Sequence, residues 1–246
     1  MKRTLACCFF FLAVLLIPKP AMAMHIMEGF LPVFWSLFWS FISLPFFIYG
    51  LYSISRNLTE NPELKLLLGV SGAFAFVLSA LKIPSISGSS SHPTGVGLGS
   101  VLFGPSIMTV IGTIVLTFQA LLLAHGGITT LGANTFSMAI AGPFAAYYIF
   151  VVSRKLRLSS KIGIFLAAFS GNLITYLVTA FQLALAFPAE NGGILVSLLK
   201  FTSVFAFTQI PLAVSEGILT VIVFNFLSVY SRNELSLLNN FKIISY

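Results

Sequence analysis

Long apolar stretches, separated by short breaks of polar residues, glycine and proline, follow one another along almost the whole chain. Apolar residues occupy all sides of each stretch, as expected for helices buried in an apolar medium. Length and breaks therefore define the elements better than periodicity does. The pattern predicts helical segments at residues 31–52, 66–81, 95–103, 106–124, 134–153, 161–187 and 195–230.

The composition agrees with helices in a bilayer rather than with a globule in water. Of the 246 residues, 58% are hydrophobic and 8% are charged, and the mean hydropathy is +1.02, whereas soluble domains carry about a quarter charged residues. We therefore predict an all-α polytopic membrane protein in contact with lipid, with about seven transmembrane segments, one of them short or re-entrant. The 13 Lys and Arg residues lie scattered near segment ends, so they indicate topology and not nucleic-acid binding.

A secretory signal peptide is predicted at the amino terminus. Lys2 and Arg3 form a positive start, residues 5–17 form an apolar run, and Ala21 and Ala23 define a small-x-small cleavage site. The run is shorter than the about 20 residues that a spanning helix needs. Cleavage would remove residues 1–23 with both cysteines, which excludes a disulfide framework, and leave 24–246 as a single transmembrane domain. An uncleaved, short first span is the alternative.

The break at Gly104-Pro105 leaves two topologies open, one kinked helix over residues 95–124 or two separate segments. We place the mature amino terminus outside the cytoplasmic membrane and count charges, because cytoplasmic loops carry an excess of Lys and Arg. Two segments put the basic cluster at residues 154–161 in the cytoplasm with Arg56, whereas one helix would put it outside. We therefore predict two segments. The first is too short to cross about 30 Å of hydrocarbon, so we expect it to be tilted, partly re-entrant or shielded by its neighbours.

This topology brings all three histidines of the chain to the outer side. His25 lies at the mature amino terminus, His92 lies in the loop at residues 83–94, and His125 begins the loop at residues 125–133. Imidazole is the commonest metal ligand in proteins. The domain at residues 24–246 is therefore predicted to bind a metal ion on its outer side.

A free terminus that begins Met24-His25 is a chelating group in itself. The α-amine of Met24, the backbone nitrogen of His25 and the imidazole of His25 close adjacent five- and six-membered rings around one ion. A strongly polarising divalent metal displaces the amide proton, and the α-amine, with a reference pKa of about 7.7–8.0, also releases a proton on binding. Three nitrogens in one plane leave a fourth position open, which suits Ni²⁺ or Cu²⁺. Without cleavage this amine would not exist.

His92 is the best candidate for the fourth ligand, because it lies on the same side in a loop rich in glycine and serine and is stiffened by Pro93. His125 could be a third imidazole ligand, a partner of the ligands or a structural residue, and we favour the last two roles. Glu28 could pair with the α-ammonium group when the site is empty or support the ligands. Met27 is a conceivable axial contact, although Met more often fills apolar space.

Glu216 is the only acidic residue deep inside an apolar segment. An ionised carboxylate at such depth costs about 2.5–3.5 kcal/mol on insertion scales, so it must be paired, protonated or functional. A structural hydrogen-bond cluster and a role in metal access or coupling remain equal alternatives. The candidate hydrogen-bonding partners on other segments are Gln182, Asn172, Gln209 and Gln119.

Four sequence blocks, spread over nearly the whole mature chain, resemble those of one known family. They are residues 24–32 (Met-His-Ile-Met-Glu-Gly-Phe-Leu-Pro), 91–99 (Ser-His-Pro-Thr-Gly-Val-Gly-Leu-Gly), 125–134 (His-Gly-Gly-Ile-Thr-Thr-Leu-Gly-Ala-Asn) and 211–217 (Pro-Leu-Ala-Val-Ser-Glu-Gly). The chain resembles the CbiM/NikM family, the substrate-binding components of energy-coupling-factor importers for cobalt and nickel. The first two blocks are specific in combination, and the other two support them.

The resemblance implies an amino terminus that inserts into the helical core, with the metal held by the nitrogens of Met24 and His25 and the side chain of His92. It also implies three kinds of partner: a transmembrane coupling protein (T component), a pair of cytoplasmic ATPases (A components) and, in cobalt systems, a small accessory membrane protein. The Met27-Glu28 pair resembles the cobalt branch more closely, since the nickel branch more often has a Pro-Asp version. Coordination alone favours Ni²⁺, because a planar four-nitrogen site suits that ion better.

We therefore expect the substrate-binding component of an ATP-driven importer for Co²⁺, with Ni²⁺ as the alternative substrate and no permanent cofactor. The sequence has no Gly-x-x-x-x-Gly-Lys-Ser/Thr motif, so another chain must hydrolyse the ATP. A rival interpretation is an intramembrane metalloenzyme. Against it, the chain has no His-Glu-x-x-His pair and no carboxylate placed as a general base beside the histidines. A second rival, a component that binds an organic vitamin, would need no particular amino terminus.

Overall fold

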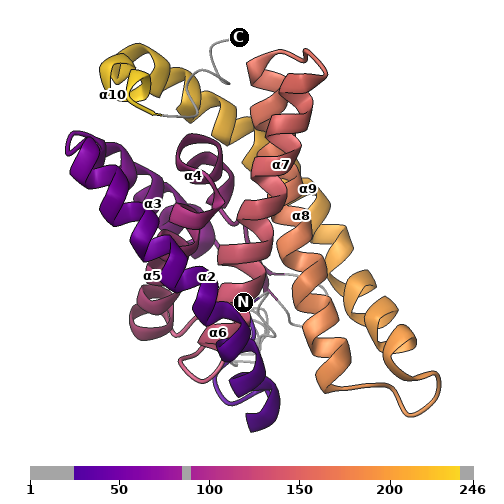
Figure 1. Cartoon of the computed structure of the whole chain (residues 1–246). Coiled ribbons are helices and arrows are strands. Elements are labelled where there is room, and N and C mark those ends of the chain that lie inside the picture. The colour runs from indigo at the N-terminus through magenta and orange to yellow at the C-terminus, as the bar shows by residue number, and fades with distance from the viewer. Residues whose placement is uncertain (1–24, 85–89, 239–246) are drawn as a thin grey trace, which may run out of the picture.

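The computed structural model describes residues 25–84 and 90–238, and within them the chain is almost entirely helical (Figure 1). A short antiparallel strand pair, β1 (Ile83–Pro84) and β2 (Ser90–Ser91), precedes helix α4 (Val96–Phe103). The predicted signal peptide, its cleavage site and Met24 lie outside the described residues. The helices, in chain order, are α2 (Val33–Glu60), α3 (Leu64–Ala80), α4 (Val96–Phe103), α5 (Pro105–Leu123), α6 (Leu131–Asn134), the π-helix η2 (Thr135–Ala141), α7 (Gly142–Lys155), α8 (Ser160–Ala186), α9 (Gly193–Tyr230) and α10 (Arg232–Ser236).

The helical membrane fold expected from the sequence is confirmed. Among the described residues, five helical spans are long and apolar enough to cross a bilayer, and α3 is a shorter apolar helix of 17 residues. Each predicted apolar segment coincides with one of these spans, with α3 or with α4. The largest difference is at the end of α2, which continues to Glu60. Its last turns are polar, and an Arg56–Glu60 pair at 3.1 Å, one helical turn apart, favours helix beyond the apolar stretch.

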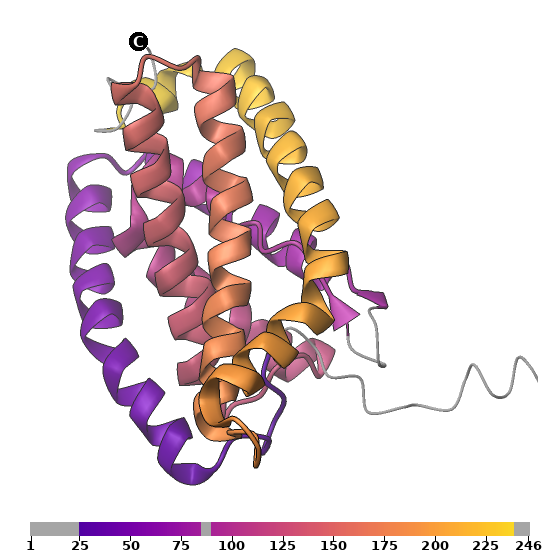
Figure 2. The ribbon, with the colours of Figure 1, turned by 90° about the vertical axis from the view of Figure 1, so that its right-hand side faces the viewer.

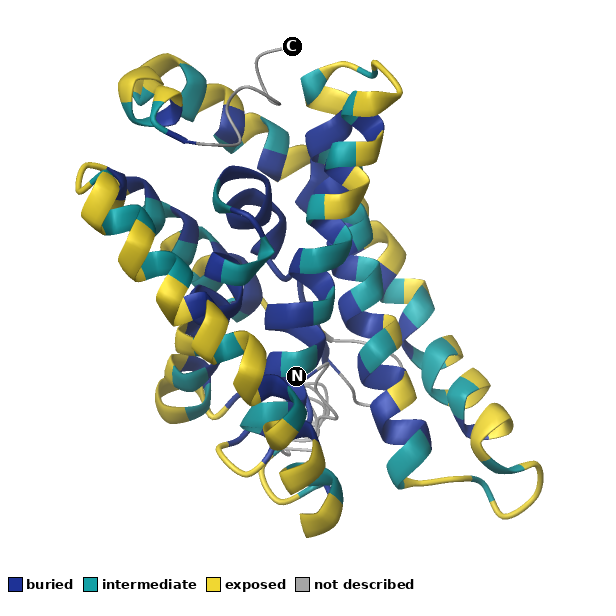
Figure 3. Ribbon diagram, in the orientation of Figure 1, coloured by how far each residue is buried: buried dark blue, intermediate teal, exposed yellow. Residues whose placement is uncertain are grey.

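The chain changes direction between α4 and α5, as the two-segment prediction requires. Gly104 joins them with φ 87° and ψ 168°, a conformation open to glycine, and Pro105 begins α5 at a position where its missing N–H leaves no bond unmade. Residues 96–102 of α4 are buried, and α4 lies in the middle of the bundle (Figure 3). The expectation that its neighbours shield this short segment is therefore confirmed.

Two groups of helices enclose α4 (Figures 1 and 2). Helices α2, α3 and α5 form one side, and α7, α8 and α9 form the other. Small residues allow close approach between helices: a Cβ on Gly97 of α4 would lie 2.6 Å from the Cα of Ala168 on α8, and one on Gly112 of α5 would lie 2.7 Å from the Cβ of Ala139. Such contacts are the usual means by which helices associate in membranes.

The outer surface of the bundle is strongly apolar. Phe34 and Phe41 on α2 and Phe207 on α9 are each more than two-thirds exposed. A soluble monomer does not keep such a large apolar surface in water, whereas lipid covers it without cost. The two ends of the bundle differ. Helices α2, α7 and α9 end, and α3 and α8 begin, at the end where Figure 1 shows α10, and the loops that carry the histidines lie toward the other.

Candidate metal centre

The first described residues, His25 and Ile26, are buried, and the chain that follows them becomes exposed at Glu28 and Gly29. Asn134, at the end of α6, holds this segment through both backbone groups of Ile26. Its Oδ1 accepts from Ile26 N at 2.9 Å and its Nδ2 donates to Ile26 O at 3.0 Å. The Thr130 hydroxyl donates to the same carbonyl at 2.6 Å. The pairing resembles one step of a β-ladder made by a side chain, and it fixes the position of His25.

Glu28 fastens the next part of the segment to the loop that follows His125. The backbone N–H of Thr129 donates to a carboxylate oxygen of Glu28 at 3.2 Å, and Gly29 N donates to the Thr129 hydroxyl at 2.9 Å. Hydrogen bonds from Thr129 lower the pKa of the exposed Glu28 carboxyl, and desolvation opposes them in part. The partners described for Glu28 thus belong to the loop, where the carboxylate acts as a latch.

His92 reaches the same place from the strand pair β1–β2. Its side chain is fully buried, and its Nδ1 lies 2.8 Å from the carbonyl oxygen of Pro93. Because a carbonyl can only accept, this contact assigns the proton to Nδ1 and leaves the lone pair of Nε2 free. A hydrogen bond from one ring nitrogen to a carbonyl is the usual way in which proteins orient a ligand histidine.

The rings of His25, His92 and His125 form one cluster. Their centroids are 4.6 Å apart for His25 and His92, 4.6 Å for His25 and His125, and 4.8 Å for His92 and His125. One nitrogen of each ring lies within 4.8 Å of the others. Within the described residues, Nε2 of each histidine is buried and has no hydrogen-bond partner. Three buried imidazoles in contact, each with one nitrogen that has no partner in this part of the chain, are an arrangement that a cation would satisfy.

All three imidazoles are held in the neutral form that binds metals. Burial lowers the pKa of His92 to about 4, and burial together with the charge that His92 would carry lowers the pKa of His125 to about 2. Burial and the two neighbouring rings also lower the pKa of His25 well below its usual value. A protonated imidazole has no lone pair to give, so neutral rings at pH 7 are ready to coordinate.

Glu216 lies outside the histidine cluster and contacts the backbone that follows His92. Its carboxylate accepts from Thr94 N at 2.6 Å, from the Thr94 hydroxyl at 2.8 Å, from Gly95 N at 2.8 Å and from Asn172 Nδ2 at 2.7 Å. Gln209 Nε2 donates to Asn172 Oδ1 at 2.6 Å. Of the four partners suggested by the sequence, Asn172 is a direct partner and Gln209 is one bond removed.

The other two suggested partners of Glu216 were wrong. Gln119 Nε2 donates to the Ser79 hydroxyl, and Gln182 Nε2 donates to the carbonyl of Ala133. Both are buried, but they point from α5 and α8 toward other elements, because the rotation of each helix directs its side chains in a way that sequence order does not show.

Sequence reasoning also missed the clamp on Ile26. Thr130 and Asn134 occur in one of the four blocks, yet no role was given to them. Their spacing of four residues was the available signal, since it puts two polar side chains on one helical face beside apolar neighbours.

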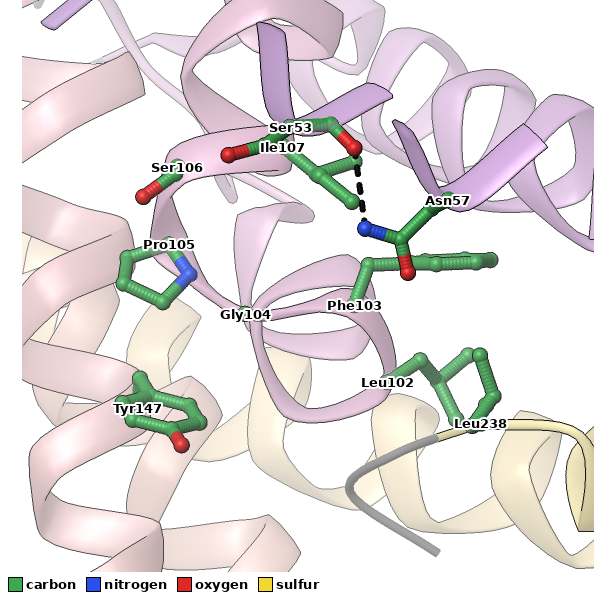
Figure 4. A pocket seen from close by; sticks show the side chains of 10 residues that line it. All are labelled: Ser53, Asn57, Leu102, Phe103, Gly104, Pro105, Ser106, Ile107, Tyr147 and Leu238. Carbon is green, nitrogen blue, oxygen red and sulfur yellow. Dashed lines mark hydrogen bonds between the residues drawn. The ribbon is translucent and has the colours of Figure 1, made fainter. Parts of the chain in front are cut away.

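A cavity lies away from the histidines, where α4 meets α5 (Figure 4). Its volume is about 240 Å³, and it is lined by parts of α2, α4, α5 and α7. Ser53, Asn57 and Tyr147 contribute polar atoms, and Asn57 Nδ2 donates to Ser53 O at 2.8 Å. None of the three histidines lines this cavity.

The fold and the histidine cluster define a class, the polytopic helical membrane proteins that transport metal ions. Two solved structures have the same fold. One is the crystal structure of a transition metal transporter, with a TM-score of 0.72, 25% identity and coverage of 83% of this chain and 92% of that one. The other is of a truncated transition metal transporter, with a TM-score of 0.71, 25% identity and coverage of 83% and 98%.

The particular family follows from the sequence. Residues 25–234 match the family CbiM, "Cobalt uptake substrate-specific transmembrane region", and the chain belongs to this family. It is 60% identical to a cobalt transport protein CbiM of Moorella thermoacetica over 92% of this chain and 88% of that protein. It is 63% identical to one of a Nostoc species over 89% and 84%. The chain is thus a membrane component of cobalt uptake, and these relatives are named transport proteins.

Proposed function

We propose that this chain is the substrate-binding component of an ATP-driven energy-coupling-factor importer and that it captures Co²⁺ from outside the cell. The observation that supports this best is the cluster of three buried imidazoles, whose Nε2 atoms have no hydrogen-bond partner within the described residues. A cation between these rings could take Nε2 of His92 and Nε2 of His125, whereas the chelate at the terminus uses Nδ1 of His25, the ring nitrogen that closes a six-membered ring with the backbone nitrogen. Cobalt is the ion of the family.

The proposed ligands are the α-amine of Met24, the backbone and imidazole nitrogens of His25, and Nε2 of His92. Signal-peptide cleavage after Ala23 creates the amine. His125 lies close enough to give a further nitrogen, since one nitrogen of each ring is within 4.8 Å of the others. Five nitrogens exceed what a planar site uses, which supports Co²⁺ and leaves Ni²⁺ as the alternative.

The proposed topology has seven membrane segments, with α4 as the short one, and an outer amino terminus. Its support is the gathering of several basic helix ends at one end of the bundle, as expected of a cytoplasmic face, with the histidines toward the other. The partners proposed are the coupling protein, the pair of ATPases and the small accessory membrane protein. We propose that these partners release the ion by moving the Met24 terminus away from His92.

The test is Co²⁺ binding in detergent by the chain purified from a cell membrane after signal-peptide cleavage, with amino-terminal sequencing to verify the Met24 terminus and with metal analysis. We compare wild type, His92→Ala and a variant with one extra residue before Met24. Asn57→Ala serves as a control, because the Asn57 side chain donates to a carbonyl within α2, beside the cavity where α4 meets α5. The affinity for Co²⁺ should fall in His92→Ala and in the extended variant, and should stay at the wild-type value in Asn57→Ala. Wild-type affinity in the extended variant would exclude the free amine as a ligand, and wild-type affinity in His92→Ala would exclude the site. Parallel titrations with Ni²⁺ decide between the two ions.

A further inference from the structure

The carboxylate of Glu216 is completely buried and receives hydrogen bonds on both oxygens. Thr94 N and Asn172 Nδ2 donate to Oε2 at 2.6 and 2.7 Å, and Gly95 N and the Thr94 hydroxyl donate to Oε1 at 2.8 Å each. Three of these four groups are N–H groups, which can only donate. A protonated carboxyl would have only the Thr94 hydroxyl to accept its hydrogen, whereas the ionised form accepts from all four groups, so this environment suits the ionised form better.

This negative charge has no cationic partner among residues 25–84 and 90–238, where the ion pair found is Arg56–Glu60 on the surface. An unpaired ionised side chain within a membrane segment is costly, and such groups mark functional positions. Neutral hydrogen-bond donors alone stabilise Glu216 in the described part of the chain. The place where a compensating positive charge would arrive is the metal centre.

The network around Glu216 ends on the chain segment that carries His92. Thr94 and Gly95 follow His92 directly, and Gln209, which donates to Asn172, also donates to the carbonyl of His92 at 3.3 Å. Every one of these side chains is buried. Glu216 on α9 therefore fixes the backbone on the carboxyl side of His92, and the direction of the imidazole depends on that backbone.

We propose that Glu216 is a positioning residue for His92 and the fixed counter-charge of the loaded metal centre. This inference rests on the proposed function. A divalent ion bound by neutral imidazoles, a neutral amine and one deprotonated amide keeps one net positive charge, and one ionised carboxylate balances it. Binding exchanges two protons, one from the α-ammonium group and one from the amide, for the divalent ion, so the positive charge that Glu216 balances stays at one unit and does not rise to two.

The experiment measures the Co²⁺ dissociation constant and the visible absorption spectrum of the Co²⁺ complex for the chain in detergent after signal-peptide cleavage. Glu216→Gln keeps the size of the side chain, removes the charge and turns an acceptor into a donor. Loss of a group that orients a ligand typically costs about 10- to 100-fold in metal affinity, and we expect a loss of that size. Glu216→Asp keeps the charge and should recover part of the affinity. Glu190→Gln, in the loop between α8 and α9, removes an exposed carboxylate and should bind as wild type does.

A second arm tests whether Glu216 acts through His92. In a His92→Ala background, Glu216→Gln should cause little further loss, because effects that pass through one shared group are not additive. Full additivity, or wild-type affinity in Glu216→Gln alone, overturns the inference. If Glu216→Gln does not fold, Thr94→Val removes one donor and keeps the charge. It should weaken binding and shift the Co²⁺ spectrum, and an unchanged affinity and spectrum would also overturn the inference.

The two proposals fail in different ways. If the wild-type chain does not bind Co²⁺, or binds it equally well without His92, the proposed function falls and this inference falls with it. If binding depends on His92 but not on Glu216, the proposed function stands and the role of Glu216 alone is refuted.

Discussion

Replacing Asn134 with leucine should weaken metal binding without removing a proposed ligand. Leucine has nearly the same size as asparagine and cannot form hydrogen bonds. The substitution deprives Ile26 N of an acceptor at 2.9 Å and Ile26 O of a donor at 3.0 Å. The carbonyl keeps the Thr130 hydroxyl as a donor, but the buried N–H loses its acceptor.

The magnitude follows from these two bonds. A buried donor left without a partner costs about 1–3 kcal/mol, and the loss of the second bond adds about 1 kcal/mol. A total of about 2–4 kcal/mol therefore opposes docking of the terminal segment, and about 1.4 kcal/mol corresponds to a factor of ten. Because only the docked segment presents His25, the affinity for Co²⁺ should fall about 30- to 700-fold.

Equilibrium dialysis against Co²⁺ measures the affinity, and hydrogen exchange of the Ile26 amide reports whether the segment stays docked. Asn57→Leu is the matched control, since the amide of Asn57 donates to the Ser53 carbonyl within α2, beside the cavity where α4 meets α5. The reasoning is refuted if Asn134→Leu binds Co²⁺ as tightly as wild type, or if it loses affinity while the Ile26 amide stays fully protected.

Three further predictions concern neighbouring positions. Gly95→Ala should lower the thermal unfolding temperature in detergent, because Gly95 has φ 70° and a new Cβ would lie 2.6 Å from the Cα of Ala75. Gly193→Ala is the control for backbone strain alone, since Gly193 has φ 61° and open space around it, and it should lower the unfolding temperature less. For Glu28, the lowered pKa means that its latch stabilises the fold above the ordinary carboxyl value of 4.5 and is lost as the pH falls below that value through the lowered pKa. Wild type should therefore unfold at a higher temperature than Glu28→Gln at pH 7, and the difference should vanish in acid; a constant difference would disprove the latch. His125→Ala should weaken Co²⁺ binding more than Ni²⁺ binding in parallel titrations, because planar Ni²⁺ needs only four nitrogens, and equal losses would argue against a fifth ligand.

The positions of the helices could be predicted from the sequence because apolar length and breakers such as Gly104-Pro105 determine them directly. The meeting of the three histidines was also foreseeable, since topology puts His25, His92 and His125 on one side. Hydrogen-bond partners were not foreseeable in the same way. Gln119 and Asn172 are equally polar and equally buried, yet only Asn172 reaches Glu216, because the rotation of each helix decides where its side chains point.

The Asn134 clamp depends on a similar three-dimensional detail. The π-helix η2 begins at Thr135, directly after Asn134, and its wider turn changes which residues share a face with those of α6 and α7. No residue of η2 predicts the switch from α-helix to π-helix, because the composition of this stretch is that of an ordinary apolar helix. The bidentate contact of Asn134 with Ile26 is therefore not predictable from the sequence.

Because α4 is short, little regular helix separates the segment that carries His92 from the cavity at the other end of α4. A helix of 8 residues is about 12 Å long. The segment that carries His92 precedes it, and Gly104 at its other end lines the polar cavity of about 240 Å³. A bilayer core is about 30 Å thick. The regular helix that separates the His92 segment from that cavity is therefore less than half as long as the surrounding hydrocarbon is thick.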